Sequence, residues 1–315
     1  MARSWKYTRG IHEIGKSCYA YLQPDGSWGW SNAGLIADGE ASLLVDTLFD
    51  LELTADMLSQ MRDATPAARN IDTLVNTHSN GDHTYGNSLV GDASIITSAA
   101  TAEEMAEITP AVMAQFLAHA DELGPAGAFF KRNFSPFHFE GIEVAMPTQT
   151  FEGELQVRVG DKHVRLIEVG PAHTRGDVLV VSEEDRVVFT GDILFIEGTP
   201  IMWEGPVENW IRACEQIEAM DVDVVVPGHG PITDPQGAGA VREYLTYVRD
   251  EARSRYDAGM TVHDAARDIA LGDYSSWGDS ERIAVNVSTL YGEFSGDDDP
   301  PDTASLFGLM AEIAR

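Results

Sequence analysis

The sequence has few cysteines, few basic residues and no long apolar run. Only 2 of its 315 residues are cysteines, Cys18 and Cys214, and neither lies in a CxxC pair, so a disulfide-stabilised scaffold is not expected. Lys and Arg total 21 against 51 Asp and Glu, and the formal net charge is −30. A surface this negative repels phosphate groups, which argues against nucleic-acid or anionic-membrane binding as the main activity.

The chain shows neither a secretion signal nor a membrane span. Its first residues, MARSWKYTRGIHEIG, contain no apolar h-region, and no stretch approaches the roughly 18 consecutive apolar residues of a transmembrane helix. With 43% hydrophobic and 23% charged residues, the composition is that of a globular protein of one large or two modest domains. We therefore expect a cytoplasmic protein without nucleic-acid or membrane partners.

The spacing of apolar residues predicts two β-rich halves with helices around them. An interrupted helical segment at about 101–140 separates the halves, and a helical tail follows the second one. This order indicates an α/β layered architecture. Strands are predicted at 17–22, 33–37, 41–46, 71–77, within 151–169, and at 178–181, 186–190 and 222–226, and helices at 51–62, 207–220 and over most of 241–269.

The densest group of metal-ligand residue types directly follows the strand predicted at 71–77. Two histidines, an aspartate and an asparagine offer imidazole, carboxylate and amide ligands suited to zinc or iron. Asp82 and His83 are adjacent, so they reach one metal only if the backbone turns sharply, which Gly81 permits. A polar loop held by Asn and Asp hydrogen bonds is the alternative interpretation. The segment is His78-Ser79-Asn80-Gly81-Asp82-His83.

Three further ligand-type residues follow predicted strands in the same way. His173, Asp192 and His229 each lie a few residues beyond a strand end, next to a glycine or proline. If the strands lie side by side, their ends converge at one edge, where the binding sites of layered α/β folds collect. This recurrence favours a metal site over the polar-loop alternative.

Together these motifs resemble those of the metallo-β-lactamase superfamily over roughly residues 15–235. The resemblance implies an α/β fold, a four-layer αββα sandwich with a one- or two-metal site at the shared edge. A catalytic domain would cover 1–240, with the helical insert at about 101–140, and a helical C-terminal extension at 241–315 would pack on it. The motifs are the HxNGDH segment at 78–83, Pro171-Ala172-His173-Thr174, Thr190-Gly191-Asp192 and Pro227-Gly228-His229-Gly230.

The resemblance also implies two neighbouring metal positions. Asn80 stands where the family pattern has a second histidine of the first position, and an amide oxygen is a poorer zinc ligand than an imidazole. Either Asn80 hydrogen-bonds the nucleophile or substrate beside a single metal, or it coordinates weakly and a second metal binds with lower affinity. Zinc is the expected ion, with iron and manganese left open. The implied ligands are His78 and His173 for the first position, Asp82, His83 and His229 for the second, and Asp192 as the bridge.

The implied activity is hydrolysis of an ester, thioester, lactone or related small organic substrate by a metal-bound hydroxide. Asp82 would orient the water or accept its proton, and Asn80 is the second catalytic candidate. Two alternatives stay open. One is an iron-dependent oxidoreductase of the sulfur-dioxygenase type on the same fold, and the other is a non-catalytic metal or ligand binder.

Aromatic residues are the candidates for contact with a small substrate of apolar character. Trp28 and Trp30 lie in the loop between the first two predicted strands, Phe130 lies in the helical insert, and Trp203 follows the TGD motif. His138 is next to the aromatic residues of the insert. Packing in the core is the alternative for the aromatic side chains.

Two expectations remain. Asp46, at the end of the strand predicted at 41–46, either orients a ligand histidine from behind or caps a turn or helix. A homodimer is the expected oligomeric state, with the small-molecule substrate as the main partner.

Overall fold

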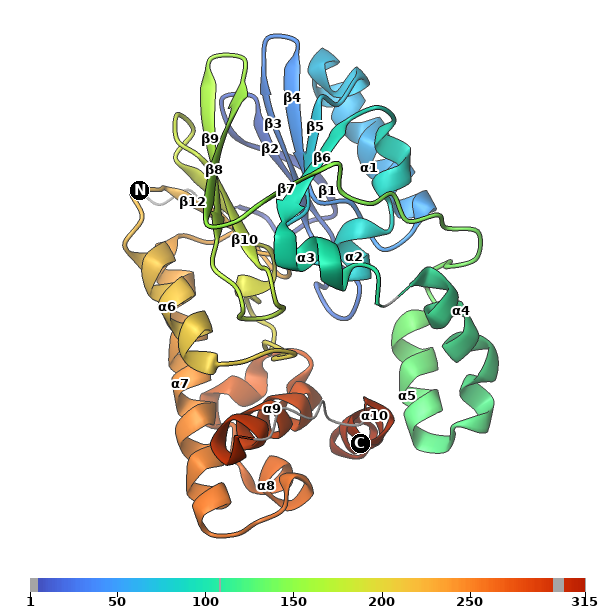
Figure 1. Cartoon of the computed structure of the whole chain (residues 1–315), viewed down its shortest axis with the longest axis vertical. Coiled ribbons are helices and arrows are strands. Elements are labelled where there is room, and N and C mark those ends of the chain that lie inside the picture. The colour runs from blue at the N-terminus through green and yellow to red at the C-terminus, as the bar shows by residue number, and fades with distance from the viewer. Residues whose placement is uncertain (1–4, 108, 297–302, 315) are drawn as a thin grey trace.

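The computed structural model describes residues 5–107, 109–296 and 303–314, which fold around two β-sheets (Figure 1). The larger sheet has 7 strands in sequence order, antiparallel from β1 to β4 and parallel from β4 to β7. These strands are β1 (Gly10–Gly15), β2 (Cys18–Leu22), β3 (Ala33–Asp38), β4 (Ala41–Val45), β5 (Thr73–Val75), β6 (Ser94–Ser98) and β7 (Gln149–Phe151).

The smaller sheet has 5 strands in the order β12-β11-β10-β9-β8. Only β11 and β12 pair in parallel, and the segments that follow these two strands carry Asp192 and His229 of the candidate site. The strands are β8 (Glu154–Val159), β9 (Lys162–Glu168), β10 (Val178–Ser182), β11 (Val187–Phe189) and β12 (Val224–Val226).

The two sheets pack face to face, and their strands carry buried side chains on both faces of each sheet. In β4, Leu43 and Val45 point into the core between the sheets, whereas Leu44 points to the opposite face, under helix α1 (Leu51–Ala64). The sheets approach closely at Gly34, where a Cβ atom would lie 2.1 Å from the ring of Phe189. The sandwich therefore requires glycine at that position.

Helices cover the outer faces of both sheets. The Asp50 side chain caps the first turn of α1 by accepting a hydrogen bond from Leu53 N at 2.8 Å. On the other side, α6 (Val207–Glu218) and α7 (Pro235–Asp257) pack together, and the apolar face of α6, which includes Trp210, joins the core under the smaller sheet. The α/β sandwich expected from the sequence is therefore confirmed.

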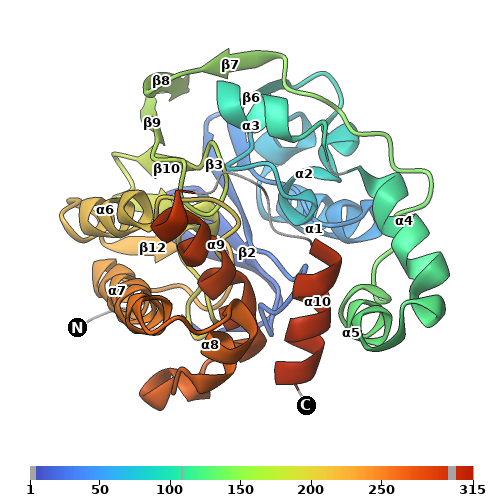
Figure 2. The ribbon, with the colours of Figure 1, turned by 60° about the horizontal axis from the view of Figure 1, so that its bottom comes forward.

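The helical insert and the C-terminal helices meet beyond one end of the sandwich. Helix α10 packs against α5, and Figure 2 shows α10 between α5 and α9. Their contact is aromatic, because Phe307 of α10 lies 6.1 Å from Phe129 and 5.7 Å from Phe130 between ring centroids. The helices are α3 (Ala99–Glu104), the short α2 (Gly81–Thr84), α4 (Pro110–His119), α5 (Gly124–Phe134), α8 (Val262–Asp268), α9 (Ile283–Ser295) and α10 (Thr303–Ile313).

Several elements differ from those expected. Strands β1 and β6 were not predicted, and the region at 151–169 contains the end of β7 and a hairpin of β8 and β9, which turns at Gly160 with φ +60°. Helix α7 runs across residue 240, while the division into 1–240 and 241–315 stays a prediction. Among the described residues, no helix is long and apolar enough to cross a membrane.

Candidate metal centre

Six ligand-type side chains converge at one edge of the sandwich, as the strand-end pattern predicts. They come from the segments that follow β5, β9, β11 and β12. Ligand atoms of two overlapping groups lie within 4.8 Å of one another. The first group is His78, His83 and Asp192, and the second is Asp82, His83 and His229. His173 lies beside the first group, because its Nε2 is 3.4 Å from Asp192 Oδ2.

All four histidines bond through Nδ1 to an acceptor outside the centre. Such a bond selects the tautomer in which Nδ1 carries the proton, so the Nε2 lone pair is free for a metal. Three of the four acceptors are not ionised groups, and two are backbone carbonyls. The acceptors are Thr77 Oγ1 for His78 (3.0 Å), Asp46 Oδ2 for His83 (2.9 Å), Ile201 O for His173 (2.7 Å) and Gly26 O for His229 (2.9 Å).

Asp46 orients two of these histidines, His83 directly and His78 through Thr77. Its Oδ2 accepts hydrogen bonds from His83 Nδ1 and, at 2.7 Å, from Thr77 Oγ1, which in turn accepts from His78 Nδ1. Its Oδ1 accepts from Thr77 N at 2.7 Å. Asp46 has φ +60°, a conformation that non-glycine residues rarely adopt. Of its two expected roles, the structure supports the orientation of a ligand-type histidine.

Asp192 lies at the middle of the group. Its Oδ1 is 3.1 Å from His83 Nε2, and its Oδ2 is 3.4 Å from both His173 Nε2 and His229 Nε2 and 3.7 Å from His78 Nε2. Gly228 allows this placement, because a Cβ atom there would lie 1.9 Å from Asp192 Oδ1. The position agrees with the bridging role that the resemblance implies.

Three atoms at the centre are buried without a hydrogen-bond partner among the described residues. They are His78 Nε2, His83 Nε2 and Asp192 Oδ1, and the 3.1 Å approach of the last two lacks hydrogen-bond alignment. A buried polar atom left unpaired costs about 1–3 kcal/mol. A cation bonded to these atoms would remove that cost, so the residues present fit a metal with nitrogen and oxygen ligands.

The charges of the centre show where protons lie when no cation is bound. Burial alone would lower the pKa of His83, but Asp192 and Asp46 outweigh it and raise that pKa well above its usual range. Burial likewise opposes the charge on His229, yet Asp192 and Asp82 raise its pKa to about 9. Protons on these two rings therefore balance the carboxylates, and a metal ion would replace them.

The other two histidines are neutral. Burial lowers the pKa of His78 well below its usual range, and the charge on His83 lowers it further. Burial also lowers the pKa of His173. A neutral imidazole is the form that binds metal ions, so these two rings need no deprotonation to act as ligands.

Asn80 faces His173 across the first metal position. Its Oδ1 lies 2.8 Å from His173 Nε2, whose ring already donates through Nδ1 to Ile201 O. Two acceptors at this distance repel one another unless a cation lies between them or the amide turns to present its N–H. Both hypotheses about Asn80, weak coordination and hydrogen bonding, are therefore consistent with its position.

The expected substrate contacts lie in different surroundings. Trp28 and Phe130 are buried in the aromatic cluster, whereas Trp30 is half-buried, 4.8 Å from Phe137 between ring centroids. Trp203 is half-buried, and the His138 side chain is 67% exposed. Contact of these side chains with a substrate stays a prediction.

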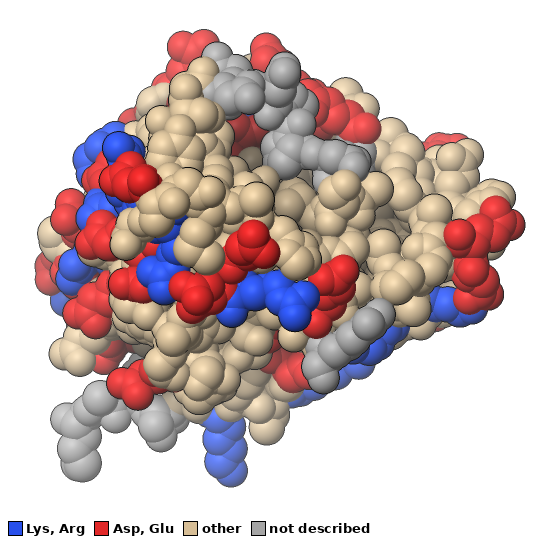
Figure 3. All heavy atoms as spheres, turned by 90° about the horizontal axis from the view of Figure 1, so that it is seen from below, with Lys and Arg blue, Asp and Glu red and all other residues tan. Residues whose placement is uncertain are grey.

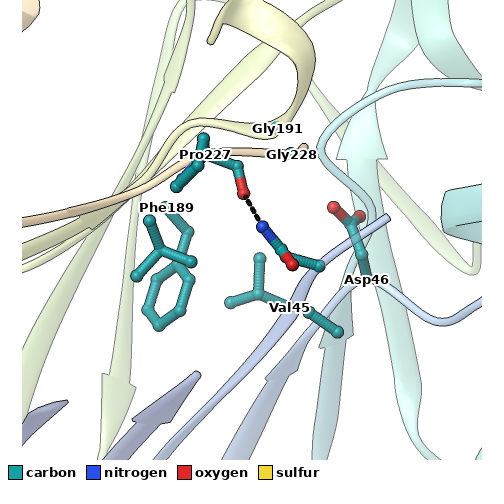
Figure 4. A pocket seen from close by; sticks show the side chains of 9 residues that line it. Val45, Asp46, Phe189, Gly191, Pro227 and Gly228 are labelled. Carbon is teal, nitrogen blue, oxygen red and sulfur yellow. Dashed lines mark hydrogen bonds between the residues drawn. The ribbon is translucent and has the colours of Figure 1, made fainter. Parts of the chain in front are cut away.

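Sequence reasoning missed Asn32, which holds the loop that carries His229. Its Nδ2 donates to Pro227 O at 3.0 Å and to Gly230 O at 2.9 Å. The dashed line at Pro227 in Figure 4 marks the first of these bonds, and Asn32 and Pro227 line a small cavity together with Val45 and Phe189. A lone asparagine in a loop gives no sequence signal of this role.

The family model of the metallo-beta-lactamase superfamily matches residues 26–229. The chain belongs to this superfamily, whose members bind metal ions, and the matched region contains every ligand-type residue of the centre.

Individual relatives are distant. A hydroxyacylglutathione hydrolase of Methylococcus capsulatus is 29% identical over 143 residues, which are 42% of this chain and 53% of that protein. An acyl-coenzyme A thioesterase of Gallus gallus is 29% identical over 84 residues, 25% of this chain and 29% of that protein. This chain thus covers about half or less of the length of these relatives.

Solved structures share the fold at low identity. The sec-alkylsulfatase Pisa1 from Pseudomonas sp. superposes with a TM-score of 0.70 at 16% identity, covering 93% of this chain and 52% of that one. A metallo-beta-lactamase from Pontibacter korlensis gives a TM-score of 0.57 at 18% identity, covering 76% of this chain and 99% of that one. The likeness to Pisa1 extends over most of the helices outside the sandwich.

Proposed function

We propose that this chain is a metal-dependent hydrolase of a small ester, thioester, lactone or related organic substrate. The observation that carries the proposal is the convergence of four Nε2 atoms on Asp192 and Asp82. Three buried polar atoms there lack a hydrogen-bond partner within the part of the chain that the structure describes. The names of the relatives support it, because hydroxyacylglutathione hydrolase, acyl-coenzyme A thioesterase and alkylsulfatase are all hydrolases.

Zinc is the expected ion, held by the ligand-type residues in the two positions that the resemblance implies. A bound divalent cation supplies Lewis-acid polarisation of a substrate oxygen and an acidified water at neutral pH. The ligands would be His78 and His173 with or without Asn80, then Asp82, His83 and His229, and Asp192 between the two positions.

Asp82 is the candidate proton acceptor. Burial would raise its pKa, but the hydrogen bond from His229 and the charge on His83 lower it, so the carboxylate is ionised at neutral pH. Its side chain is 13% exposed, compared with 4% for Asp192, which leaves it the more accessible carboxylate of the two. Asp82 can therefore orient an attacking water and take up its proton.

The apolar part of the substrate would contact the loop at 28–32. Ser31 Oγ donates to the backbone oxygen of Asp82, which ties this loop to the metal centre. Trp30, the residue before Ser31, is half-buried against Phe137. The loop thus offers an aromatic surface beside the candidate proton acceptor, which favours a substrate with an apolar group.

The first experiment is elemental analysis of protein purified without added metal. We expect one or two zinc ions per chain, and turnover of at least one member of a panel of esters, thioesters and lactones. Chelation and the substitution His83→Ala should each abolish that turnover, whereas His163→Ala, which changes a histidine paired with Glu184 away from the centre, should not.

Other outcomes of the same experiment would contradict the proposal. One iron per chain, together with thiol-dependent oxygen uptake, would indicate the oxidoreductase. Failure to bind any metal after reconstitution would indicate a binder of another kind. Turnover that survives both chelation and His83→Ala would show that hydrolysis does not use this centre.

A further inference from the structure

Residues 278–282, which precede helix α9, contact the segment that connects Asp192 of the metal centre to helix α6. Gly278 N donates to Glu197 O and Thr199 N donates to Gly278 O, both at 2.9 Å. The same connecting segment pairs with the loop of His229, because Ile196 N donates to His229 O at 3.0 Å. A continuous backbone path therefore joins residues 278–282 to His229.

Arg282 ends this segment in an interior position. Its side chain is 2% exposed, and its guanidinium carbon lies 4.5 Å from the ring centroid of Trp28 and 5.2 Å from that of Phe195. Asp279 balances the charge at 3.0 Å, and Thr199 O accepts a hydrogen bond at 2.9 Å. A buried arginine needs such partners because desolvation of its charge is costly.

Phe195 connects Arg282 to the metal centre. Its ring stacks on the imidazole of His229 with centroids 5.1 Å apart and planes 7° from parallel. Arg282 packs against the same ring. The guanidinium therefore helps to hold the ring plane against which His229 lies.

A second route runs through the loop that begins at Gly26, whose carbonyl accepts the Nδ1 proton of His229. The next residue, Ser27, donates from Oγ to Asp279 Oδ1 at 2.7 Å, and Trp28 Nε1 donates to Glu281 Oε1 at 3.2 Å. The side chains of residues 278–282 thus hold the loop that fixes the tautomer of His229.

Asp279 adopts an unusual backbone conformation at the centre of these contacts. Its φ is +57°, in the left-handed region, which is unfavourable for residues other than glycine. The conformation directs its two carboxylate oxygens to two different partners, Ser27 and Arg282. Interactions around it outweigh the cost, as is typical of functional sites.

We propose that residues 278–282 are a positioning element for His229, and that Arg282 sets the metal affinity of the position held by Asp82, His83 and His229. The proposal rests on the proposed metal site. It gives the C-terminal part of the chain, outside the matched family region, a direct role in the metal centre.

The test is a cobalt titration of the metal-free full-length protein, followed by visible absorption and by competition with a chromophoric chelator. Arg282→Lys keeps the charge near Asp279 but cannot lie flat against two rings. We expect it to weaken cobalt binding about ten- to hundredfold and to change the cobalt spectrum, because both depend on the residues that hold a metal ligand in its orientation. Trp28→Phe removes the hydrogen bond to Glu281 and leaves a smaller ring against Arg282, and it should shift affinity in the same direction by less.

The control is Arg255→Lys, because Arg255 also lies in the C-terminal part, is 18% exposed and pairs with Glu251 and Asp268, but touches none of these contacts. It should leave cobalt affinity and spectrum unchanged. Wild-type affinity and spectrum in Arg282→Lys would overturn the inference, whatever Trp28→Phe does, as would an equal loss in Arg255→Lys. A wild-type protein that binds no cobalt would instead overturn the proposed metal site.

Discussion

At the scale of single residues, the metal centre depends on atoms that would touch no metal. Asp46 and Thr77 form one hydrogen-bonded unit that directs both His78 and His83 inward. The carbonyls of Gly26 and Ile201 do the same for the other two histidines. The ligand-type residues are thus oriented before any ion binds, which reduces the ordering cost of binding.

Asn80 is the residue at which metal stoichiometry can be changed. The substitution Asn80→His places an imidazole where an amide faces His173, and imidazole is the stronger ligand for zinc. We expect the weaker of the two metal positions to gain affinity, so that metal content after dialysis moves towards two ions per chain. Elemental analysis of both proteins measures this. An unchanged content, with Asn80→Ala also at the wild-type value, would show that Asn80 does not limit the first position.

Asp177 gives a dependence of stability on pH. Burial raises its pKa from 3.8 to about 8, although Thr174 donates two hydrogen bonds to it. The folded state holds this proton more tightly than the unfolded state, so the stabilisation is complete below pH about 4 and is lost as the pH rises to about 8. In metal-free protein, the unfolding free energy of Asp177→Asn minus that of wild type should therefore increase from pH 5 to pH 8.5.

Urea unfolding of both proteins at the two pH values measures this gain. Because both variants contain the same remaining titratable groups, their difference isolates Asp177. The same difference in unfolding free energy at both pH values would mean that the pKa of Asp177 is not raised.

At the scale of elements, one buried ion pair joins three turns at the end of the sandwich. Lys162, at the start of β9, contacts Asp185 at 2.7 Å, with side chains 7% and 1% exposed. Lys162 Nζ also donates to the backbone oxygen of Lys16, in the turn between β1 and β2. Asp185 lies in the turn between β10 and β11. The pair thus links the two sheets.

Removing one partner of this ion pair should lower the stability of the protein. Lys162→Met leaves the carboxylate of Asp185 buried without its cation, which we expect to lower the unfolding free energy by about 3–5 kcal/mol. The matched control is Lys131→Met, because Lys131 pairs with Asp121 on the surface with half its side chain exposed. The control should change stability by less than about 1 kcal/mol in chemical denaturation. Equal losses in the two variants would contradict the buried role of Lys162.

At the scale of the whole molecule, the dominant feature is the net charge of −30. Acidic and basic side chains are interspersed on the face shown in Figure 3, where no single patch of one sign covers the surface. On this face, the acidic side chains are therefore not gathered into one patch. Repulsion among the excess carboxylates lowers the stability of the folded protein.

Salt should stabilise the protein. Between 0.1 and 1 M NaCl the screening length falls from about 10 Å to about 3 Å, which weakens repulsion between exposed carboxylates. We expect the melting temperature to rise on the order of 2–4 °C, which in a large domain corresponds to a gain of about 1 kcal/mol in the free energy of unfolding. Replacing the exposed Glu122, Glu140 and Glu152 by Gln should reduce the rise. A melting temperature that falls with salt in the wild type would show that attractive ion pairs dominate.

The fold class and the group of ligand-type residues were both predictable from the sequence. His173, Asp192 and His229 each lie just past a strand end that is followed by Gly or Pro, and this is a local pattern that a single chain displays. Strand β6 was missed although it is as long as β2, β4 and β10, which were predicted, so its length is not the reason. The hairpin of β8 and β9 has its turn at Gly160-Asp161, which lies within a longer β-rich stretch.

The sequence by itself determined the layered α/β fold, the acidic surface and the residue types gathered at one edge, because these follow from spacing and composition. Only the tertiary structure decided which atoms orient His173 and His229, since Gly26, Ile201 and Asn32 act through contacts between residues far apart in the chain. It also brought Arg282 against Trp28 and Phe195. Backbone carbonyls exist at every residue and carry no sequence signal, so their partners appear only when the chain has folded.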